Sequence, residues 1–365
     1  MNNQRREMVD GASAIARGAL DAGCNYFAGY PITPASGILS HMLRELPKVG
    51  GIGFQGEDEI SSLGHCIGAA MAGATVFTAT SGPGLSLYSE NLGLAIMMEV
   101  PIVIAISQRL GPSTGAATAS AQGDIQFMRW GTTGGYPMIV LSPTNISESY
   151  HLTKRAFKLA KRFRTPVFLA SDKDTVMTTE SVPVDDMKHA PDWPEIPNGV
   201  IKKPLDPYRV DGPIHHYTGS SHNDDGHITK DPDIIATLNE RLRMKIESNL
   251  DELSLVKSDL EAGADTLMVS YGVSARSMDA AVNKIRNAGN KVSSMTIYSL
   301  WPIPEKTIQD CLKGIKRVIV PEMNHGQYLR EIERLVNRDI ELIGVNRVDT
   351  ILITPEEIIG AYHGR

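Results

Sequence analysis

Short apolar segments of strand character alternate with helical segments over the first 175 residues, and this alternation restricts the possible folds more than any other feature. The clearest strand segment, Pro101–Ser107, reads PIVIAIS and carries no charge. Strands that are apolar throughout are buried on both faces, so the helices between them must cover both sides of a parallel sheet. The predicted strands are Asn25–Ala28, Gly51–Gln55, Thr75–Thr80, Pro101–Ser107, Met138–Leu141 and Pro166–Ala170. The predicted helices are Val9–Ala22, Ser36–Leu46, Asp58–Ala72, Ser86–Met98 and Ile146–Phe163.

A second α/β unit follows a connector of different composition. Residues 182–229 are rich in Pro, Asp, His and Gly and have little periodicity, and residues 232–260 are predicted to form one long polar helix. We therefore expect two doubly wound α/β domains, at residues 1–181 and 263–365, joined by a connector at residues 182–262. The strands expected in the second domain are Thr266–Ser270, Lys291–Tyr298 and Arg317–Pro321, and the helices are Ala275–Asn287, Glu305–Leu312 and Gln327–Val336.

Charge and cysteine content exclude several classes of protein. The formal net charge of −6 leaves no basic excess to neutralise nucleic acid phosphates. The three cysteines, Cys24, Cys66 and Cys311, are too few and too widely spaced for a disulfide framework or an iron–sulfur cluster, which favours a reducing, cytoplasmic setting. The N-terminus has no secretory pattern. The thirty uncharged residues from Ile60 to Ser89 are rich in Gly, Ala, Ser and Thr, so we interpret them as buried core and expect no membrane segment.

Four of the predicted strands in the first domain end in unusual loops. The first ends in Gly29–Pro34 (GYPITP), where two prolines stiffen the turn that presents Thr33. The third ends in Thr78–Gly84 (TATSGPG), which allows a ligand close to the backbone. The fourth ends in Gln108–Gly115 (QRLGPSTG), and the second leads to the carboxylates of residues 57–59. Ligands bind at the carboxyl ends of parallel strands, so these loops predict a ligand site at that edge.

Each of these signals also has a purely structural explanation. A Gly-Pro-Gly segment can be only a turn, Glu57 and Asp58 can simply complement a helix dipole, and Arg109 can form a surface ion pair. The convergence of these loops with one Arg and one Glu on one sheet edge favours the site. Neither GxGxxG after a strand nor GxxxxGK[ST] is present, so the Gly-Pro-Gly loop is not a Rossmann pyrophosphate site.

The connector contains a cluster of residues that could bind metal. These residues are His215, His216, His222, Asp224, Asp225 and His227. Their spacing matches no standard metal site, and no predicted helix or strand supports them. A hydrated loop that faces a partner protein is the preferred interpretation, and no metal site is predicted in this chain.

Six segments together resemble the α subunits of 2-oxoacid:ferredoxin oxidoreductases, most of all those that act on 2-oxoglutarate. The segments are GYPITPAS, QGEDEISSLGHCIGAAMAGA, TATSGPGLSLYSENLGLAIMMEVP, QRLGPSTG, QGDIQFMRWG and PEMNHGQYLREIER. They cover almost the whole chain in order. The resemblance implies that the first domain has the pyrimidine-binding thiamine diphosphate fold and that the second is similar to the C-terminal domain of transketolases.

The resemblance also assigns roles to particular residues. Glu59 aligns with the glutamate that contacts the aminopyrimidine ring of the cofactor and favours its imino tautomer. Thr33 and Arg109 align with the substrate-binding threonine and arginine, and a guanidinium suits the carboxylate of a 2-oxoacid. Cofactor contacts are expected from the GYPITP and TATSGPG loops, at Tyr30, Pro31, Ser81 and Gly82. One departure is Leu110, which stands where the family commonly has Gly.

A motif absent from the sequence implies a partner chain. The thiamine diphosphate fold binds its diphosphate through Mg²⁺ at a GDG motif, whereas Gly123-Asp124 is followed here by Ile125 and Asp225-Gly226 by His227. The resemblance therefore implies thiamine diphosphate shared at an interface with a β subunit, which supplies Mg²⁺ and a [4Fe–4S] cluster. Ferredoxin and CoA are the other expected partners, γ and δ subunits can be separate chains, and a dimer of such heteromers is expected.

Three functions remain open from the sequence. The first is oxidative decarboxylation of 2-oxoglutarate with CoA, which the EDE and PSTG segments at residues 57–59 and 112–115 favour modestly. The second is the same chemistry on a branched-chain, aryl or pyruvate-type 2-oxoacid. The third is a non-catalytic α/β binding subunit, which the grouping of Thr33, Glu59 and Arg109 on one edge disfavours.

Overall fold

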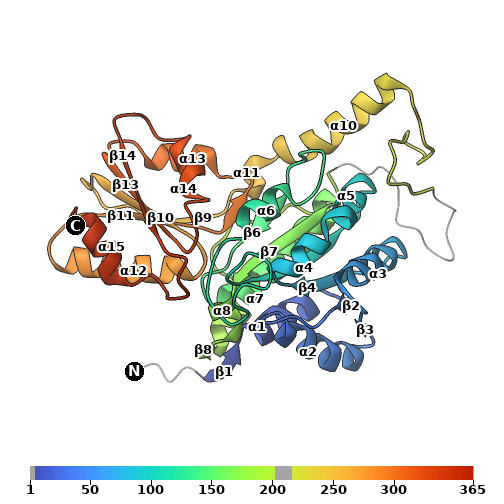
Figure 1. The fold of residues 1–365 in the computed structure, drawn as a ribbon, viewed down its shortest axis with the longest axis horizontal. Helices are drawn as coiled ribbons and strands as arrows, with labels where there is room; N and C mark the ends of the chain where they lie inside the picture. The colour runs from blue at the N-terminus through green and yellow to red at the C-terminus, as the bar shows by residue number, and fades with distance from the viewer. Residues whose placement is uncertain (1–4, 202–215, 365) are drawn as a thin grey trace.

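A computed structural model describes residues 5–201 and 216–364 and contains a larger and a smaller open sheet, the smaller one at the left of Figure 1. The larger sheet has seven strands, of which six are parallel and β12 is antiparallel. In spatial order these are β12 (Ser299–Trp301), β6 (Ile139–Leu141), β7 (Pro166–Asp172), β5 (Ile102–Gln108), β4 (Val76–Thr80), β2 (Tyr26–Gly29) and β3 (Ile52–Gln55). The predicted α/β class with parallel strands is confirmed.

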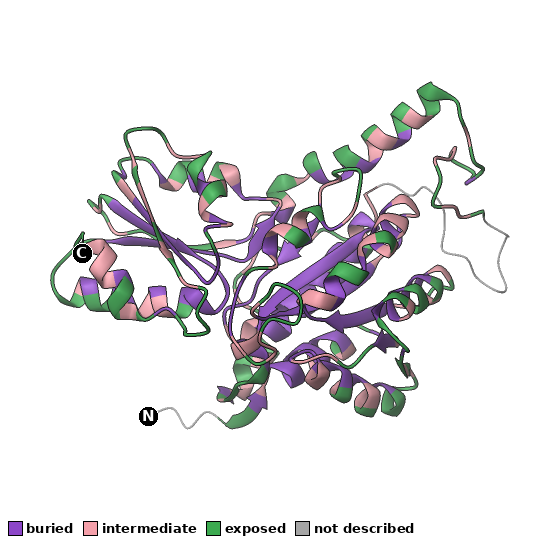
Figure 2. Ribbon diagram, in the orientation of Figure 1, coloured by how far each residue is buried: buried purple, intermediate pink, exposed green. Residues whose placement is uncertain are grey.

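Helices cover both faces of this sheet because alternate residues of its strands point to opposite sides. In β5, Val103 and Ala105 belong to the core on one face, and Ile102, Ile104 and Ile106 belong to the core on the other. The helices on the first face are α1 (Gly11–Asp21), α2 (Ser36–Glu45) and α7 (Ile146–Phe163). Those on the second face are α3 (Glu59–Met71), α4 (Gly82–Leu87), α5 (Ser89–Met97) and α6 (Ile125–Trp130). Figure 2 shows the inner strands β4, β5, β6 and β7 as buried and the outer helix faces as exposed, whereas the edge strand β3 is mostly exposed.

The smaller sheet has five strands, four parallel and one antiparallel. In spatial order these are β14 (Glu341–Asn346), β13 (Arg317–Glu322), β10 (Thr266–Ser270), β11 (Ser293–Ile297) and β9 (Val256–Asp259). Helices α12 (Gly272–Asn287) and α15 (Pro355–Tyr362) cover one face. The other face carries α13 (Glu305–Cys311) and α14 (Leu329–Glu333) and shares one hydrophobic core with the larger sheet. The two units therefore share one continuous hydrophobic core.

The prediction of one long helix over residues 232–260 is wrong. Helix α10 (Pro232–Glu247) stops before Asn249, whose φ of −127° and ψ of 30° are not helical, and a short α11 (Leu250–Leu253) follows. The next residues form β9, which pairs antiparallel with β11 at the edge of the smaller sheet. Pairing with the edge of the smaller sheet therefore determines the conformation of residues 256–259. Local composition does not reveal such pairing.

Several elements lie outside the predicted set. Strands β1 (Arg6–Asp10) and β8 (Thr179–Pro183) pair with each other, and β12 joins the larger sheet from the C-terminal half of the chain. The predicted helix at residues 86–98 is two helices, because α4 already begins at Gly82 and α5 follows at Ser89. Short helices η1 (Leu46–Val49), α8 (Lys173–Met177) and α9 (Val184–Lys188) complete the described elements. None of the helices in the described ranges is long and apolar enough to cross a membrane.

Candidate active site

The carboxyl ends of four neighbouring strands bring the unusual loops to one edge of the larger sheet. Strands β5, β4, β2 and β3 are adjacent and parallel, with Thr80 opposite Ile106 and Gly29 opposite Gln55. Because the four strands run in one direction, the loops that follow them start from the same edge.

The three carboxylates that follow β3 are in different environments. Asp58 is the N-cap of α3: its side chain accepts a 2.7 Å hydrogen bond from the Ser61 backbone N–H, and Ser61 returns a bond to the Asp58 backbone. Glu57 and Asp58 are exposed, whereas Glu59 is only 6% exposed. Asp58 therefore caps the helix, and Glu59 is the buried carboxylate of the three.

The Gly82-Pro83-Gly84 segment separates two carboxyl groups. A Cβ on Gly84 would lie 2.6 Å from Glu59 Oε1 and 2.1 Å from Thr80 Oγ1. A Cβ on Gly82 would lie 3.1 and 3.2 Å from the two carboxyl oxygens of Asp124. The segment was predicted as a loop that lets a ligand approach, but it is the first turn of α4, and its glycines leave room for Glu59 on one side and Asp124 on the other.

Arg109 and Thr33 are in direct contact. Arg109, at the end of β5, is 5% exposed, and its Nη1 donates a 2.5 Å hydrogen bond to the main-chain oxygen of Thr33. Burial lowers the pKa of Arg109, and the negative charge of Asp124 acts in the opposite direction. Thr33 is half-buried, while Tyr30 and Pro31 in the same loop are exposed. The structure thus joins the two predicted substrate residues through the Thr33 carbonyl oxygen.

Asp124 is a site residue that sequence reasoning missed. It occupies the N-cap position of α6, yet within the described parts of the chain its side chain makes no capping hydrogen bond. The carboxyl group lies against Gly82 and interacts with the charge of Arg109, and burial raises its pKa to about 6 despite that charge. The available signal is its place in QGDIQFMRWG, one of the segments that carry the family resemblance, although Gly123-Asp124 is not part of a GDG motif.

Buried polar atoms without partners gather at this edge. Among the described residues, Thr80 Oγ1, Ser81 Oγ, Arg109 Nε and Asp124 Oδ2 are buried and have no hydrogen-bond partner. Such atoms are rare in folded proteins, because each costs about 1–3 kcal/mol. Four of them along one sheet edge indicate a site built to receive a polar ligand.

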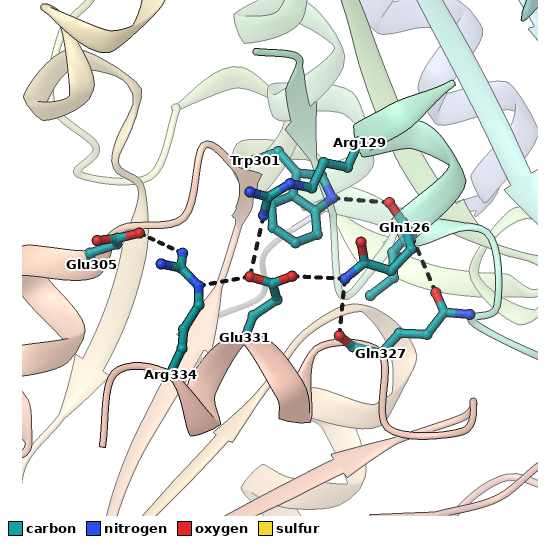
Figure 3. A network of polar contacts seen from close by, with 8 residues as sticks. Gln126, Arg129, Trp301, Glu305, Gln327, Glu331 and Arg334 are labelled. Atoms are coloured by element: carbon teal, nitrogen blue, oxygen red, sulfur yellow. Dashed lines mark hydrogen bonds and ion pairs between the residues drawn. The ribbon is translucent and has the colours of Figure 1, made fainter. Parts of the chain in front are cut away.

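The second domain holds the segment that carries Asp124. The Gln122 backbone N–H donates to the Met323 carbonyl oxygen at 2.8 Å, and Gln327 Nε2 donates to the Gly123 carbonyl oxygen at 2.7 Å. Gln126 Nε2 donates to Glu331 Oε1 at 2.9 Å, as Figure 3 shows. The two motifs QGDIQFMRWG and PEMNHGQYLREIER therefore form one interface between the sheets.

Aromatic and charged side chains complete this interface (Figure 3). Arg129 lies over the ring of Trp301, 4.3 Å from its centroid, and its Nη1 donates to Glu331 Oε2 at 3.2 Å. Trp301 is buried and donates its indole N–H to the Ile125 carbonyl oxygen at 3.0 Å. Both ends of α6 are thus attached to the second domain.

The histidine-rich connector forms a small turn away from this edge. His222 and Ile228 form an antiparallel bridge, the rings of His216 and His227 lie 4.1 Å apart, and His227 contacts Asp225 at 3.0 Å. His215, which the sequence grouped with them, lies outside the described residues. In the described part of the chain, no three His, Cys, Asp or Glu side chains are grouped so that they could hold a metal ion.

The fold and the site define an α/β protein with a ligand site at the carboxyl edge of a parallel sheet. Comparison with known families identifies which family of such proteins this is. Residues 17–240 match the family described as "Pyruvate flavodoxin/ferredoxin oxidoreductase, thiamine diP-bdg", and residues 264–358 match "Pyruvate:ferredoxin oxidoreductase core domain II". The first domain is thus a thiamine diphosphate-binding domain of an oxidoreductase. The chain belongs to the family of 2-oxoacid:ferredoxin oxidoreductase α subunits.

Individual relatives agree with this assignment. The chain is 38% identical to the 2-oxoglutarate synthase subunit KorA of Methanocaldococcus jannaschii, over 98% of this chain and 99% of that protein. It is 34% identical to the ketoisovalerate oxidoreductase subunit VorB of Methanothermobacter thermautotrophicus, over 97% of this chain and 96% of that protein.

Solved structures support the fold of both domains. A 2-oxoglutarate:ferredoxin oxidoreductase from Magnetococcus marinus, solved with 2-oxoglutarate, coenzyme A and succinyl-CoA bound, matches with a TM-score of 0.90 and 30% identity. The match covers 100% of this chain, which spans only 66% of that longer chain. A split gene transketolase matches with a TM-score of 0.56 at 13% identity, which shows a shared fold alone.

Proposed function

We propose that this chain is the α subunit of a 2-oxoglutarate:ferredoxin oxidoreductase. With its partner, it would convert 2-oxoglutarate and CoA into succinyl-CoA and CO2 while ferredoxin is reduced, a reaction that is reversible in principle. The observation that carries the proposal is the placement of Glu59, Arg109 and Thr33 at one sheet edge, among buried polar atoms without partners. The similarity to KorA over almost the full chain supports 2-oxoglutarate as the substrate.

The residues beside Glu59 fit the pyrimidine half of thiamine diphosphate. Glu59 offers a buried carboxyl group, and Thr80 and Ser81 offer buried hydroxyl oxygens that lack partners among the described residues. Gly82 leaves the backbone accessible, and Tyr30 and Pro31 provide an exposed surface on the neighbouring loop. When bound, the cofactor supplies the nucleophilic carbon that attacks the keto group of the substrate. Glu59 would hold a proton at its carboxyl group, next to the ring nitrogen of the pyrimidine.

Arg109 and Thr33 would bind the 1-carboxylate of the 2-oxoacid. The Nε of Arg109 is buried and free of partners within the described residues, so a carboxylate can accept from it. The bond from Nη1 to the Thr33 carbonyl oxygen holds the guanidinium at the sheet edge. The Thr33 hydroxyl group can bond to the same carboxylate or to the keto oxygen.

A β subunit would complete the cofactor site. We infer this partner from the missing GDG motif and the three scattered cysteines, Cys24, Cys66 and Cys311. The partner would bind the diphosphate, Mg²⁺ and a [4Fe–4S] cluster, and ferredoxin would accept the electrons. We propose that the complex is a cytoplasmic dimer of heteromers. We also propose that residues 1–181 and 263–365 are the two domains of this chain. Isolated, the chain should contain no iron; stoichiometric iron would contradict this part of the proposal.

A panel of 2-oxoacids tests the function. The complex, purified with its natural partners, is assayed for CoA-dependent reduction of a viologen dye with 2-oxoglutarate, pyruvate, ketoisovalerate and an aryl 2-oxoacid. The value of kcat/KM should be highest for 2-oxoglutarate. A maximum with ketoisovalerate would support the branched-chain alternative, which the 34% identity to VorB favours. Failure of every oxoacid to reduce the dye would support a non-catalytic subunit.

A further inference from the structure

A buried carboxylate of the first domain caps a helix of the second domain. Asp172, at the carboxyl end of β7, is 1% exposed and lies opposite Gln108, at the end of β5. Its Oδ2 accepts a 2.5 Å hydrogen bond from the backbone N–H of Val273, in the first turn of α12. The N-cap residue of α12, Tyr271, makes no capping bond with its own side chain among the described residues. A helix N-terminus favours a carboxylate at this place.

Two glutamine side chains donate to the same carboxylate. Gln108 Nε2 donates to Asp172 Oδ1, and Gln122 Nε2 donates to Asp172 Oδ2, each at 3.3 Å. An ionised carboxylate can only accept hydrogen bonds, so it selects the nitrogen end of each amide. The carboxylate thereby fixes the orientation of both amides: each nitrogen faces Asp172, and each amide oxygen is directed elsewhere.

The oxygen of the Gln108 amide faces the segment that carries Asp124. It accepts the backbone N–H of Asp124 at 3.4 Å. Gln108 directly precedes Arg109, and the Asp124 carboxyl group lies next to Gly82 at the start of α4. The Gln108 amide therefore connects the strand end that leads to Arg109 with the Asp124 segment, and its orientation depends on Asp172.

The Gln122 amide connects the same carboxylate to the second domain. Its Oε1 accepts the Ser274 hydroxyl at 2.7 Å and the Met323 backbone N–H at 3.0 Å. Its Nε2 also donates to the Tyr271 carbonyl oxygen at 3.3 Å. Since Gln122 lies two residues before Asp124, the second domain and Asp172 together hold the beginning of that segment.

We propose that Asp172 is a positioning residue of the candidate site, and that it acts by holding the amides of Gln108 and Gln122 in one orientation. Through Gln108 it fixes the Asp124 segment against the strand end that leads to Arg109. Through Gln122 it joins this segment to the second domain. The inference rests on the proposed function, in which Arg109 binds the oxoacid, and Asp172 itself does not contact the substrate.

Capping of α12 alone makes a different prediction from this positioning role. Asparagine caps helices about as well as aspartate, so a cap alone would tolerate Asp172→Asn. An amide has only one acceptor oxygen, which can keep the bonds from Val273 and Gln122, because both donate to Oδ2. The new NH2 group then faces the Nε2 of Gln108. Either these two donors oppose each other, or the Gln108 amide turns and opposes the Asp124 N–H, so that a buried donor is left unsatisfied.

Exchange of the two side-chain groups tests the proposal. In the double variant Asp172→Asn/Gln108→Glu the carboxylate is moved to position 108, where it can accept from the new amide and from the Asp124 N–H. The two single variants and the double variant are prepared as complete complexes with the natural partners. Dye reduction with 2-oxoglutarate is measured at pH 8, because burial raises the pKa of Asp172 to about 7 and the ionised form accepts from all three donors.

The single variants should lose activity and the double variant should recover it. Asp172→Asn should lower kcat/KM about 10- to 100-fold, chiefly through a higher KM, since a misplacement of about 1 Å has effects of this size. Gln108→Glu alone brings two carboxylates together and should lose a similar factor. The double variant should return to within about threefold of the wild-type value, which is the signature of two groups that act as a pair.

Two outcomes of this exchange would overturn the proposal. Normal kinetics of Asp172→Asn would mean that Asp172 is only a helix cap. Losses in both single variants without recovery in the double variant would mean that Gln108 does not transmit its effect. If a thermal melt shows that Asp172→Asn does not fold, Gln108→Met serves instead, because it removes the amide and leaves the cap. Gln108→Met should then show the same loss in kcat/KM, and normal activity of this variant would contradict the inference.

A matched control and the wild-type measurement separate this inference from the proposed function. Asp10 caps α1 by accepting from the Ser13 backbone N–H at 2.8 Å, so Asp10→Asn makes the same chemical change at another helix cap and should leave the kinetics unchanged. Failure of the wild-type complex to reduce the dye with any 2-oxoacid would contradict the proposed function. Activity of the wild type together with either overturning result would contradict only the role of Asp172.

Discussion

The two sides of the Gly82-Pro83-Gly84 turn contain carboxyl groups that the fold holds in different ways. On one side, Glu59 is the first residue of its own helix, and the Asp58 cap sets its place. On the other side, Asp124 belongs to a segment held by hydrogen bonds from the second domain. Local structure positions Glu59, the proposed cofactor group, and tertiary contacts with the second domain position Asp124. Changes on the two sides should therefore affect different steps.

The largest effect is expected on the Glu59 side. Glu59→Gln keeps the shape of the side chain but cannot hold the carboxyl proton, so turnover of the complex should fall by roughly 10²–10⁴ while the thermal unfolding temperature stays the same. Dye reduction and a thermal melt measure the two quantities. Glu57→Gln is the control and should remain active. Full activity of Glu59→Gln together with an inactive Glu57→Gln would show that the wrong carboxylate was assigned.

Removal of the Arg109 side chain should lower activity less than Glu59→Gln does. A charge-assisted hydrogen bond to the oxoacid carboxylate contributes roughly 1.5–3 kcal/mol, so Arg109→Ala should lower kcat/KM about 10- to 150-fold for every 2-oxoacid. Arg109→Lys should restore only part of it, because an ammonium lacks the planar fork. A loss confined to dicarboxylic substrates would mean that Arg109 binds the distal carboxylate. Dissociation of the complex with unchanged kinetics would identify an interface residue instead.

The two glycines of the turn allow a direct comparison of its sides. In Gly84→Ala the new methyl group would lie 2.1 Å from Thr80 Oγ1 and 2.6 Å from Glu59, so we expect a loss of about 1–3 kcal/mol in stability and displacement of Glu59. In Gly82→Ala the nearest atoms are at 3.1 Å, so a shift of a few tenths of an ångström suffices and the loss should be smaller. Denaturant unfolding of both variants measures the difference. Equal losses would contradict the close packing of Glu59 against Gly84.

The smallest effect is expected at the interface between the domains. Glu331 accepts hydrogen bonds from Gln126, Arg129 and Arg334 (Figure 3), so Glu331→Gln should weaken contacts to charged groups by about 1–2 kcal/mol. Because this interface holds the Asp124 segment, KM for the oxoacid should rise more than kcat falls. Kinetics at saturating substrate separate the two parameters. A larger fall in kcat than rise in KM would show that the interface also supports the Glu59 side.

Much of the fold could be predicted from the sequence, and so could the Glu59 side of the Gly82-Pro83-Gly84 turn. Apolar strands such as Pro101–Ser107 predict a buried parallel sheet, and parallel strands bring the loops with Thr33, Glu59 and Arg109 to one edge. Asp124 could not be found in this way, because no predicted strand leads directly into its segment and no helix was predicted there. Its partners at residues 322–331 are about two hundred residues away in sequence.

The sequence by itself determined the fold class, the site edge and the family resemblance, since these depend on local periodicity and on motifs that are contiguous in the chain. Tertiary structure alone decided which of three adjacent carboxylates is buried, because that depends on which side of α3 faces the sheet. It also turned Val256–Asp259 from predicted helix into an edge strand, and it placed the Asp124 carboxyl group next to Gly82. In each case the deciding contact joins separate elements of the fold: Glu59 packs against Gly84 of α4, β9 pairs with β11, and residues 323 and 327 hold the segment that carries Asp124.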